Sequence, residues 1–235
     1  MQIKGVVETS FVDWDGKIVS TIFLPGCNFR CGFCHNHKLV LEPEGFDSIS
    51  PAILLKYWRR NKDFLDGVCI TGGEPTLHRE LPELCRNIKE LGLKVKLDTN
   101  GTNPEVLRQL MDEKLLDYIA MDIKAPLEEE SYSDLTNVNL NDTFDMIKES
   151  IRIIINSGVD YEFRTTVIRE KHSKEDIEAI AMALKGVRRY VLQKFQPKEV
   201  MDEEYKVYTS YNDEEMEEIV KVVKKYINAV RWRGK

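Results

Sequence analysis

The sequence predicts an α/β fold in which parallel strands form one sheet. Short apolar runs, typical of buried strands, alternate along the chain with amphipathic patterns, typical of helices packed on a sheet. Strict alternation implies right-handed crossovers between parallel strands. Polar motifs follow several of the apolar runs, and in open sheets and barrels of this class ligands bind at the carboxyl ends of the strands. The order of the elements therefore predicts one site at that edge.

The expected elements follow one another without a linker or a repeat. Strands, about six in number, are expected at residues 18–24, 67–71, 94–97, 118–123, 161–168 and 189–195. Helices are expected to begin near residues 51, 80, 104, 142, 173 and 212, and the last one to continue to about 230. Before the first of these strands, residues 3–8 alternate loosely like an edge strand, and residues 13–16 have the composition of a turn.

Several helix starts carry local signals. Ser50 and Asn103 each precede a proline at the first helical position, which predicts that they cap their helices. Ser173 with Asp176 resembles a capping box. The stretch 126–141 is polar and acidic without a clear period, and we expect it to form a long loop, of a length that is often functional.

Length and composition indicate one soluble globular domain over residues 1–235, with a core at about 17–197 and a C-terminal helix at about 212–230. The net charge of −6 disfavours nonspecific nucleic-acid binding. No apolar run approaches the roughly 18 residues of a membrane span, and the N-terminus lacks the apolar core of a signal peptide. We therefore expect a cytoplasmic protein without a membrane partner.

Three of the five cysteines, Cys27, Cys31 and Cys34, lie within eight residues, just beyond the first confident strand. Cysteines clustered on a loop of a cytosolic chain indicate a metal or an iron–sulfur cluster rather than a disulfide. The other two, Cys69 in an apolar run and Cys85 in a helical pattern, are expected to be core residues.

Two kinds of site fit the cysteine loop. Three thiolates on a four-iron cluster leave one iron without a protein ligand, which is the open position that a catalytic metal needs. A structural zinc would instead need a fourth ligand, which His35 or His37 could supply. The cysteines alone leave both open.

Two glycine-containing motifs follow the next strands. In Gly72-Gly73-Glu74-Pro75, two residues without side chains let the backbone approach a ligand closely, and Glu74 could accept hydrogen bonds from an ammonium group. In Asp98-Thr99-Asn100-Gly101, the polar side chains could bind a ribose. Either motif could instead be only a tight turn, because these residue types favour turns.

Charged residues end the later strands. Asp122 and Lys124 are two apart, so they share one side of a strand and, if buried, need each other or a ligand. The alternative is a surface ion pair. Arg164 and Gln193 on the following strands could complete the ring, although a strand arginine can be paired for structural reasons alone.

The C-x3-C-x2-C spacing of the cysteine loop resembles the radical S-adenosylmethionine superfamily. The resemblance implies a partial (β/α)6 barrel, open on one side. It also implies a [4Fe-4S] cluster on Cys27, Cys31 and Cys34, whose open iron binds S-adenosylmethionine and, once reduced, cleaves it to a 5′-deoxyadenosyl radical. The resemblance also places Phe33 beside the adenine, Gly72, Gly73 and Glu74 at the amino group, and Lys124 at the carboxylate. The other strand-end residues expected to bind this cofactor are Asp98, Asn100, Asp122 and Arg164.

From about residue 5 to 197, the motifs resemble the branch of the superfamily that activates glycyl radical enzymes, and His35-Asn36 after the third cysteine is typical of it. Residues 9–23 and 26–31 look most like activating proteins of anaerobic ribonucleoside-triphosphate reductase. This implies a glycyl radical enzyme as partner, flavodoxin or ferredoxin as electron donor, and an anaerobic setting. In two places the sequence departs from the branch: His37 replaces a usual proline, and residues 191–196 lack the late histidine of the pyruvate formate-lyase activase.

Three other functions remain open on the sequence. The protein could activate a different glycyl radical enzyme, such as a pyruvate formate-lyase. It could use the same radical chemistry on a small molecule, a peptide or an RNA, although the acidic charge disfavours RNA. It could also be a zinc-binding protein without catalysis, which would leave the polar strand ends unexplained.

Overall fold

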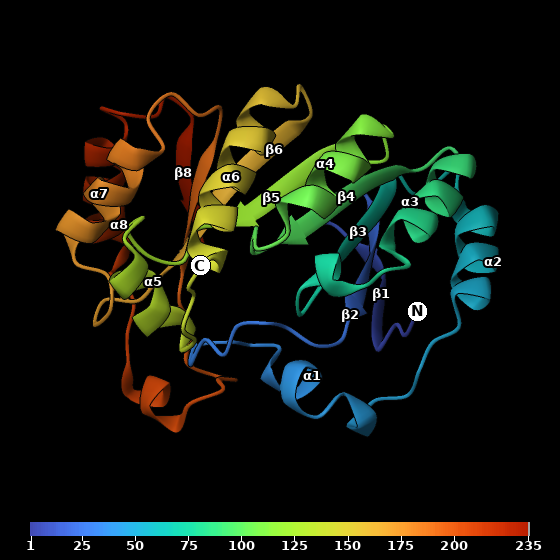
Figure 1. Ribbon diagram of the computed structural model, residues 1–235, viewed down its shortest axis with the longest axis horizontal. Coiled ribbons are helices and arrows are strands. Elements are labelled where there is room, and N and C mark those ends of the chain that lie inside the picture. The colour runs from blue at the N-terminus through green and yellow to red at the C-terminus, as the bar shows by residue number, and fades with distance from the viewer. Residues whose placement is uncertain (235) are drawn as a thin grey trace.

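The computed structural model describes residues 1–234. Its eight strands form one sheet in chain order, from β1 at one edge to β8 at the other (Figure 1). The first two strands pair antiparallel and each later pair is parallel. Because the two outermost strands do not pair with each other, the sheet stays open on one side.

The strands are β1 (Gly5–Ser10), β2 (Val19–Leu24), β3 (Gly67–Gly72), β4 (Lys94–Thr99), β5 (Tyr118–Asp122), β6 (Asp160–Val167), β7 (Tyr190–Lys194) and β8 (Val230–Arg233). The α-helices are α1 (His37–Leu41), α2 (Pro51–Asn61), α3 (Leu81–Glu90), α4 (Pro104–Asp112), α5 (Glu129–Thr136), α6 (Thr143–Asn156), α7 (Lys174–Ala183) and α8 (Asp213–Val223). Three 3-10 helices complete the list: η1 (Pro43–Gly45), η2 (Pro75–Leu77) and η3 (Glu203–Val207).

The six predicted parallel strands are confirmed as β2 to β7, which form the expected open (β/α)6 arrangement. Each end of the sheet carries one more strand. The predicted edge strand exists as β1, but it runs antiparallel to β2. The last helix ends at Val223 instead of continuing to about 230, and β8 follows it. A four-residue strand is too short for its alternation to stand out in a sequence, and its pairing with β7 forms only in the folded sheet.

The expectation of a long loop at residues 126–141 is wrong, because this stretch contains α5. Glu129 and Glu130 occupy its first turn, where carboxylates favour a helix. Only three of its eight residues, Tyr132, Leu135 and Thr136, are buried. So narrow an apolar face gives a weak helical period, which explains why the pattern was not visible.

The capping predictions are confirmed in one case and corrected in two. Ser173 and Asp176 form a full capping box, and Asn212 forms a second one with Glu215. Ser50 and Asn103 occupy the capping positions of α2 and α4, but neither side chain accepts a capping hydrogen bond. The Asn103 amide instead donates to the carbonyl oxygen of Thr76, 3.0 Å away, and thereby ties α4 to the turn after β3.

The main core lies between the sheet and the helices that run along its outer face (Figure 1), and it includes Cys85. A smaller cluster fills the inside of the barrel near the amino ends of the strands; its members are Trp14, Val19, Cys69, Tyr118 and Ala120. The Trp14 ring lies 5.6 Å from that of Tyr118. The β1–β2 turn therefore folds into the barrel near the amino ends of its strands. Cys69 and Cys85 are both core residues, as expected.

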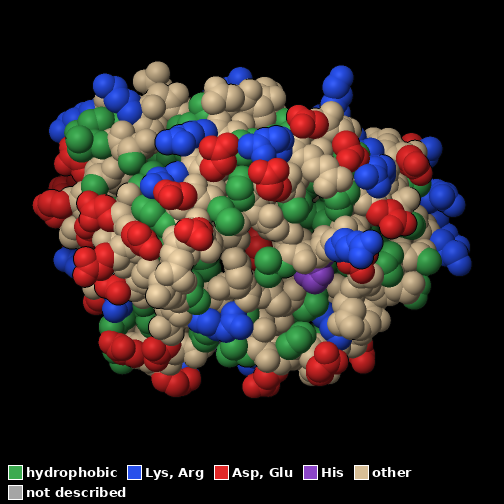
Figure 2. All heavy atoms as spheres, in the orientation of Figure 1, with side chains coloured by type: hydrophobic (Ala, Val, Ile, Leu, Met, Phe, Trp, Pro, Cys, Tyr) green, Lys and Arg blue, Asp and Glu red, His purple; other side chains and the backbone are tan. Residues whose placement is uncertain are grey.

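On the face seen in Figure 2, acidic side chains gather at the left and bottom, over the region of α7, α8 and η3, among basic and apolar ones. No helix within residues 1–234 is both long enough and apolar enough to cross a membrane.

Candidate functional site

One cavity of about 430 Å³ lies at the carboxyl ends of the parallel strands. Of the twelve residues that the sequence assigns to the cluster or the cofactor, eleven line it: Cys27, Cys31, Phe33, Cys34, Gly72, Gly73, Asp98, Asn100, Asp122, Lys124 and Arg164. The twelfth, Glu74, is fully buried behind the cavity wall. A cavity of about 570 Å³ at the opposite end of the barrel contains none of these residues. The fold thus brings the predicted residues together at the predicted edge.

The three clustered cysteines are free thiols that face this cavity. Cys31 is 6% exposed and the other two are half-buried. Burial raises the pKa of Cys27 to about 11 and that of Cys31 to about 12, and it raises the pKa of Cys34 as well. Thiols in such surroundings ionise when a bound cation compensates the charge. Three such sulfur donors on one cavity fit an iron–sulfur cluster.

The two histidines near the cysteine loop bond to backbone. His35 Nε2 lies 2.8 Å from the Gln196 carbonyl oxygen, and His37 Nδ1 lies 3.2 Å from that of Cys34. Within residues 1–234, no three His, Cys, Asp or Glu side chains converge closely enough to hold a single metal ion.

The cysteine loop is held by polar residues that the sequence did not single out. Asn28 accepts from the Asn100 amide and donates to the Thr102 hydroxyl, both at 2.8 Å. The Arg30 guanidinium donates to the Cys27 carbonyl oxygen at 2.6 Å, and the Arg30 backbone N–H donates to Thr136 of α5 at 2.8 Å. Asn28 and Arg30 both lie between the first two cysteines of the motif. This position is the one feature of the sequence that would have pointed to them.

A second contact covers the loop from the C-terminal side. Gly32 lies against the Tyr205 ring, and a Cβ atom added there would be 2.2 Å from Tyr205 Cε2. The backbone N–H of Asp202 donates to the Gly32 carbonyl oxygen at 2.9 Å. The Phe33 ring, 6% exposed, lies 6.1 Å from that of Tyr205 and 5.7 Å from Lys124 Nζ. The segment around η3 is therefore part of the wall behind the cysteines.

The two glycines after β3 make room for the chain itself. A Cβ atom on Gly72, whose φ is +123°, would lie 2.3 Å from the Leu24 carbonyl oxygen, and one on Gly73 would lie 1.7 Å from that of Gly26. Hydrogen bonds of 2.8 Å join Gly73 N–H to Leu24 and Glu74 N–H to Gly26. The close approach that glycine permits is thus to the end of β2, immediately before the first cysteine.

Glu74 links β3 to β4. Its carboxylate accepts four hydrogen bonds: from the Thr76 N–H (3.0 Å) and hydroxyl (2.6 Å), from the Thr99 hydroxyl (2.8 Å) and from the Asn100 N–H (2.6 Å). Burial raises the pKa of Glu74, against the effect of these donors. With its oxygens engaged in this way, Glu74 holds Asn100 at the cavity wall.

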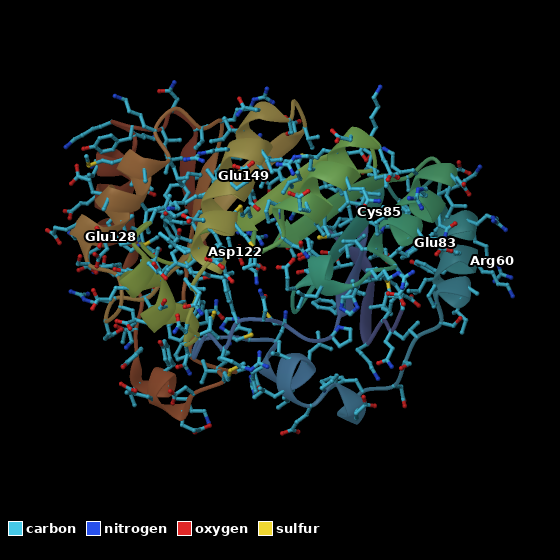
Figure 3. All side chains as sticks on the ribbon, in the orientation of Figure 1. Arg60, Glu83, Cys85, Asp122, Glu128 and Glu149 are labelled. Atoms are coloured by element: carbon cyan, nitrogen blue, oxygen red, sulfur yellow. The ribbon has the colours of Figure 1, made fainter. Side chains whose placement is uncertain are left out.

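A network of charges spans the ends of β4, β5 and β6 (Asp122 is labelled in Figure 3). Arg164 binds both Asp98, at 3.0 Å, and Asp122, at 2.8 Å. Lys124 also binds Asp122, at 2.8 Å, and Lys96 binds Asp98, at 3.1 Å. The pairing predicted for Asp122 and Lys124 is confirmed, and it lies in the cavity wall, where the side chains are only 29% and 15% exposed.

The pairing outweighs burial at each of these groups. Burial raises the pKa of Asp122, but the charges of Arg164 and Lys124 lower it by a larger amount, so the net shift is downward. The pKa of Asp98 is lowered in the same way, chiefly by Arg164. Burial lowers the pKa of Lys124, yet Asp122 reverses the shift. Asp98, Asp122 and Lys124 are therefore charged near neutral pH.

The backbone of Lys124 is fixed by two residues that the sequence did not reveal. Its N–H lies 3.0 Å from the Tyr132 hydroxyl, and its carbonyl oxygen accepts from Nε2 of His172 at 2.8 Å. Nδ1 of His172 accepts from the Ile168 N–H at 3.2 Å, which requires the neutral tautomer protonated on Nε2. His172 is fully buried, and burial lowers its pKa. It therefore acts as a neutral link between β5 and the turn after β6.

Comparison with known proteins gives consistent results. The model of the Radical SAM superfamily matches residues 21–184. A protein of Methanocaldococcus jannaschii named "Putative glycyl-radical enzyme activating enzyme" is 37% identical over 97% of this chain and 94% of its own length. A protein of Sulfurisphaera tokodaii named "Probable GTP 3',8-cyclase" is 28% identical over 89% of this chain and 64% of its own.

Among solved structures, a radical SAM methyltransferase from Sphaerobacter thermophilus has the same fold. It aligns with a TM-score of 0.72 at 17% identity and covers 96% of this chain and 69% of that one. The family model covers well over half of the chain, and the M. jannaschii relative covers nearly all of it. On these grounds the protein, with its three clustered cysteines and open barrel, belongs to the radical SAM superfamily.

Proposed function

We propose that this protein generates a glycyl radical on a partner enzyme, and that the partner is anaerobic ribonucleoside-triphosphate reductase. The observation that carries the proposal is the joint position of three free thiols and a charged network in one cavity. The name of the M. jannaschii relative, which matches over nearly the whole chain, supports the activating role. The choice of reductase rests on the likeness of residues 9–23 and 26–31 to such activating proteins.

Cys27, Cys31 and Cys34 would hold the [4Fe-4S] cluster that membership of the family implies. S-adenosylmethionine would lie against the cavity residues on β3, β4 and β5. Bound together and given one electron by flavodoxin or ferredoxin, the two groups would supply a carbon-centred radical that takes a hydrogen atom from the substrate. An anaerobic cytoplasm suits this chemistry.

The charged network suits the carboxylate of S-adenosylmethionine. Three cations, Lys96, Lys124 and Arg164, face two carboxylates, Asp98 and Asp122, so the network retains one positive charge. Lys124 Nζ lies 5.7 Å from the ring of Phe33, which we assign to the adenine. Gly72, Gly73 and Asn100 would contact the rest of the molecule, while Glu74 acts by holding Asn100.

The test is anaerobic reconstitution with iron and sulfide, reduction with dithionite, addition of S-adenosylmethionine, and quantification of 5′-deoxyadenosine. The protein should form 5′-deoxyadenosine, and the Cys31→Ala variant should not. Electron paramagnetic resonance should then detect a glycyl radical when the reductase is added. A radical on a pyruvate formate-lyase-type enzyme instead would leave the activating role intact and overturn the choice of partner.

A second candidate is a nucleotide substrate, which the likeness to a protein named as a GTP 3',8-cyclase favours. Mass spectrometry of the same reduced mixture with GTP added separates the two. Conversion of GTP, without a glycyl radical on any partner enzyme, would favour this candidate over the first.

A further inference from the structure

We propose that Arg233, positioned by Gln193, binds the substrate peptide by donating hydrogen bonds to a backbone carbonyl oxygen beside the target glycine. The inference rests on the proposed activating function. It concerns the part of the cavity that the assigned cofactor contacts do not use.

The cavity has a second polar wall on the C-terminal strands. Thr166, Gln193 and Arg233 all line it. They are lateral neighbours in the sheet, because Thr166 pairs with Gln193 across β6 and β7, and Gln193 pairs with Arg233 across β7 and β8. We call these three residues the polar row. It lies beyond Arg164, the last residue assigned to the cofactor.

Arg233 is held less tightly than the other cavity cations. Its Nη2 lies 3.8 Å from Glu162. With the Gln193 amide oriented so that its oxygen faces the guanidinium, Nη2 and Nε donate to that oxygen at 3.2 and 3.3 Å. A guanidinium has five N–H donors and no acceptor. The two donors on Nη1 take part in neither of these contacts, and the side chain is 30% exposed. The group is therefore able to bind an added acceptor.

The position of the polar row makes a substrate the natural occupant. Hydrogen-atom transfer needs the reacting atoms within about 3–3.5 Å, so the substrate must share the cavity with the cofactor. Arg233 lies on β8, at one open edge of the sheet, and lines the same cavity as the three clustered cysteines. A substrate that enters the cavity beside β8 would meet this row in the same space as the cysteines.

A peptide fits the row chemically. An extended chain presents carbonyl oxygens at regular intervals, and a terminal strand of a sheet is a common docking place for such a chain. A guanidinium donates to these oxygens whatever the side chains are. The row would thereby fix the glycine Cα relative to the cofactor.

The probe is a ten-residue peptide spanning the radical-bearing glycine of a glycyl radical enzyme from the same organism, with that glycine dideuterated. In turnover a Cα–deuterium bond breaks, the deuterium atom enters the methyl group of 5′-deoxyadenosine, and the unpaired electron stays on the glycine. Dithionite supplies the electron for cofactor cleavage. Binding of a fluorescent copy is measured separately by anisotropy, with cofactor present and reductant absent.

Arg233→Gln should weaken peptide binding at least tenfold and lower the deuterium content of 5′-deoxyadenosine to a similar extent, while total 5′-deoxyadenosine stays within twofold of wild type. Arg233→Lys keeps the charge but loses the fork of donors. Its peptide affinity and deuterium transfer should lie between those of the wild type and Arg233→Gln. Arg231→Gln is the matched control, because Arg231 lies two residues earlier on the same strand and lines the opposite cavity. It should behave as wild type in both assays.

Wild-type binding and deuterium transfer in Arg233→Gln would overturn this inference and leave the activating function standing. The inference would also be overturned by an equal loss in the Arg231 control. Absence of deuterium transfer in the wild type, with normal 5′-deoxyadenosine, would overturn both the inference and the proposed function, and a carboxylate-bearing small molecule would then be the better occupant of the row.

Discussion

The two sides of the cavity are built with different precision. On the β3–β6 side, Glu74 accepts four hydrogen bonds of 3.0 Å or less, and Arg164 binds two carboxylates at 2.8 and 3.0 Å. On the β7–β8 side, Arg233 makes contacts of 3.2 to 3.8 Å. A site for a cofactor of constant shape benefits from side chains locked in advance, whereas a looser wall can adjust to a substrate that arrives.

The sharpest test of this contrast removes one arginine from each side. Arg164→Met leaves Asp98 and Asp122 close together without their shared cation, and we expect a loss of about 3–5 kcal/mol in the free energy of unfolding. Arg233→Met should cost under about 1 kcal/mol, because its ion pair is long and partly solvated. Urea unfolding of the cluster-free protein measures both. Equal losses would remove the distinction between the two sides.

The next largest effect is expected at Glu74. Glu74→Gln keeps the shape of the side chain but replaces an acceptor oxygen by an NH2 group that faces donors. We expect a loss of about 2–3 kcal/mol, the cost of leaving buried hydrogen-bonding groups unsatisfied. Glu83→Gln on the exposed face of α3 serves as the control. If the two variants unfold at the same urea concentration, Glu74 does not join β3 to β4 as described.

The wall behind the cysteines is tested by adding one methyl group. Gly32→Ala places a Cβ atom against the Tyr205 ring and should cost about 1–3 kcal/mol by overpacking. Retained iron after gel filtration should fall as well, and Tyr205→Leu in the same chain should restore part of both. Gly45→Ala, which meets no atom within 4 Å, is the matched control. Unchanged iron content in Gly32→Ala would show that this contact does not support the loop.

The smallest effect is a pH dependence at His172. Burial lowers its pKa below 6.5 in the folded protein. As the pH falls below 6.5, His172 becomes protonated in the unfolded chain but stays neutral in the folded protein. The free energy of unfolding therefore decreases, by at most about 1.4 kcal/mol per pH unit. The decrease ends once the pH reaches the lowered folded pKa. Asp176 is the nearby charge that opposes the shift.

Urea unfolding of the cluster-free protein at several pH values between 7.5 and 5.5, compared with His172→Gln, isolates this contribution. The variant should show a shallower decrease, because glutamine does not titrate. Parallel curves for the two proteins would mean that His172 is not the neutral link between Lys124 and Ile168.

What could be predicted from the sequence was local. Strand and helix patterns repeat every two or 3.6 residues, so the parallel core was visible, and the C-x3-C-x2-C spacing lies within eight residues. Because parallel strands end at one edge, even the convergence of Cys31, Asp98 and Lys124 followed from chain order. Two elements were not predicted because their local patterns are weak. The helix α5 has a narrow apolar face, and the strand β8 has only four residues.

Only the tertiary structure decided which partner each polar group has. Glu74 turns inward to Thr99 and Asn100, and Tyr205 closes on Gly32 from more than 170 residues away in the chain. His172 and Arg233 join the site in the same way. Such pairings depend on where distant segments meet, and no periodicity or spacing encodes that meeting. The sequence by itself thus determined the chemistry available to the site, and packing determined which side chains face the cavity and which hold it in place.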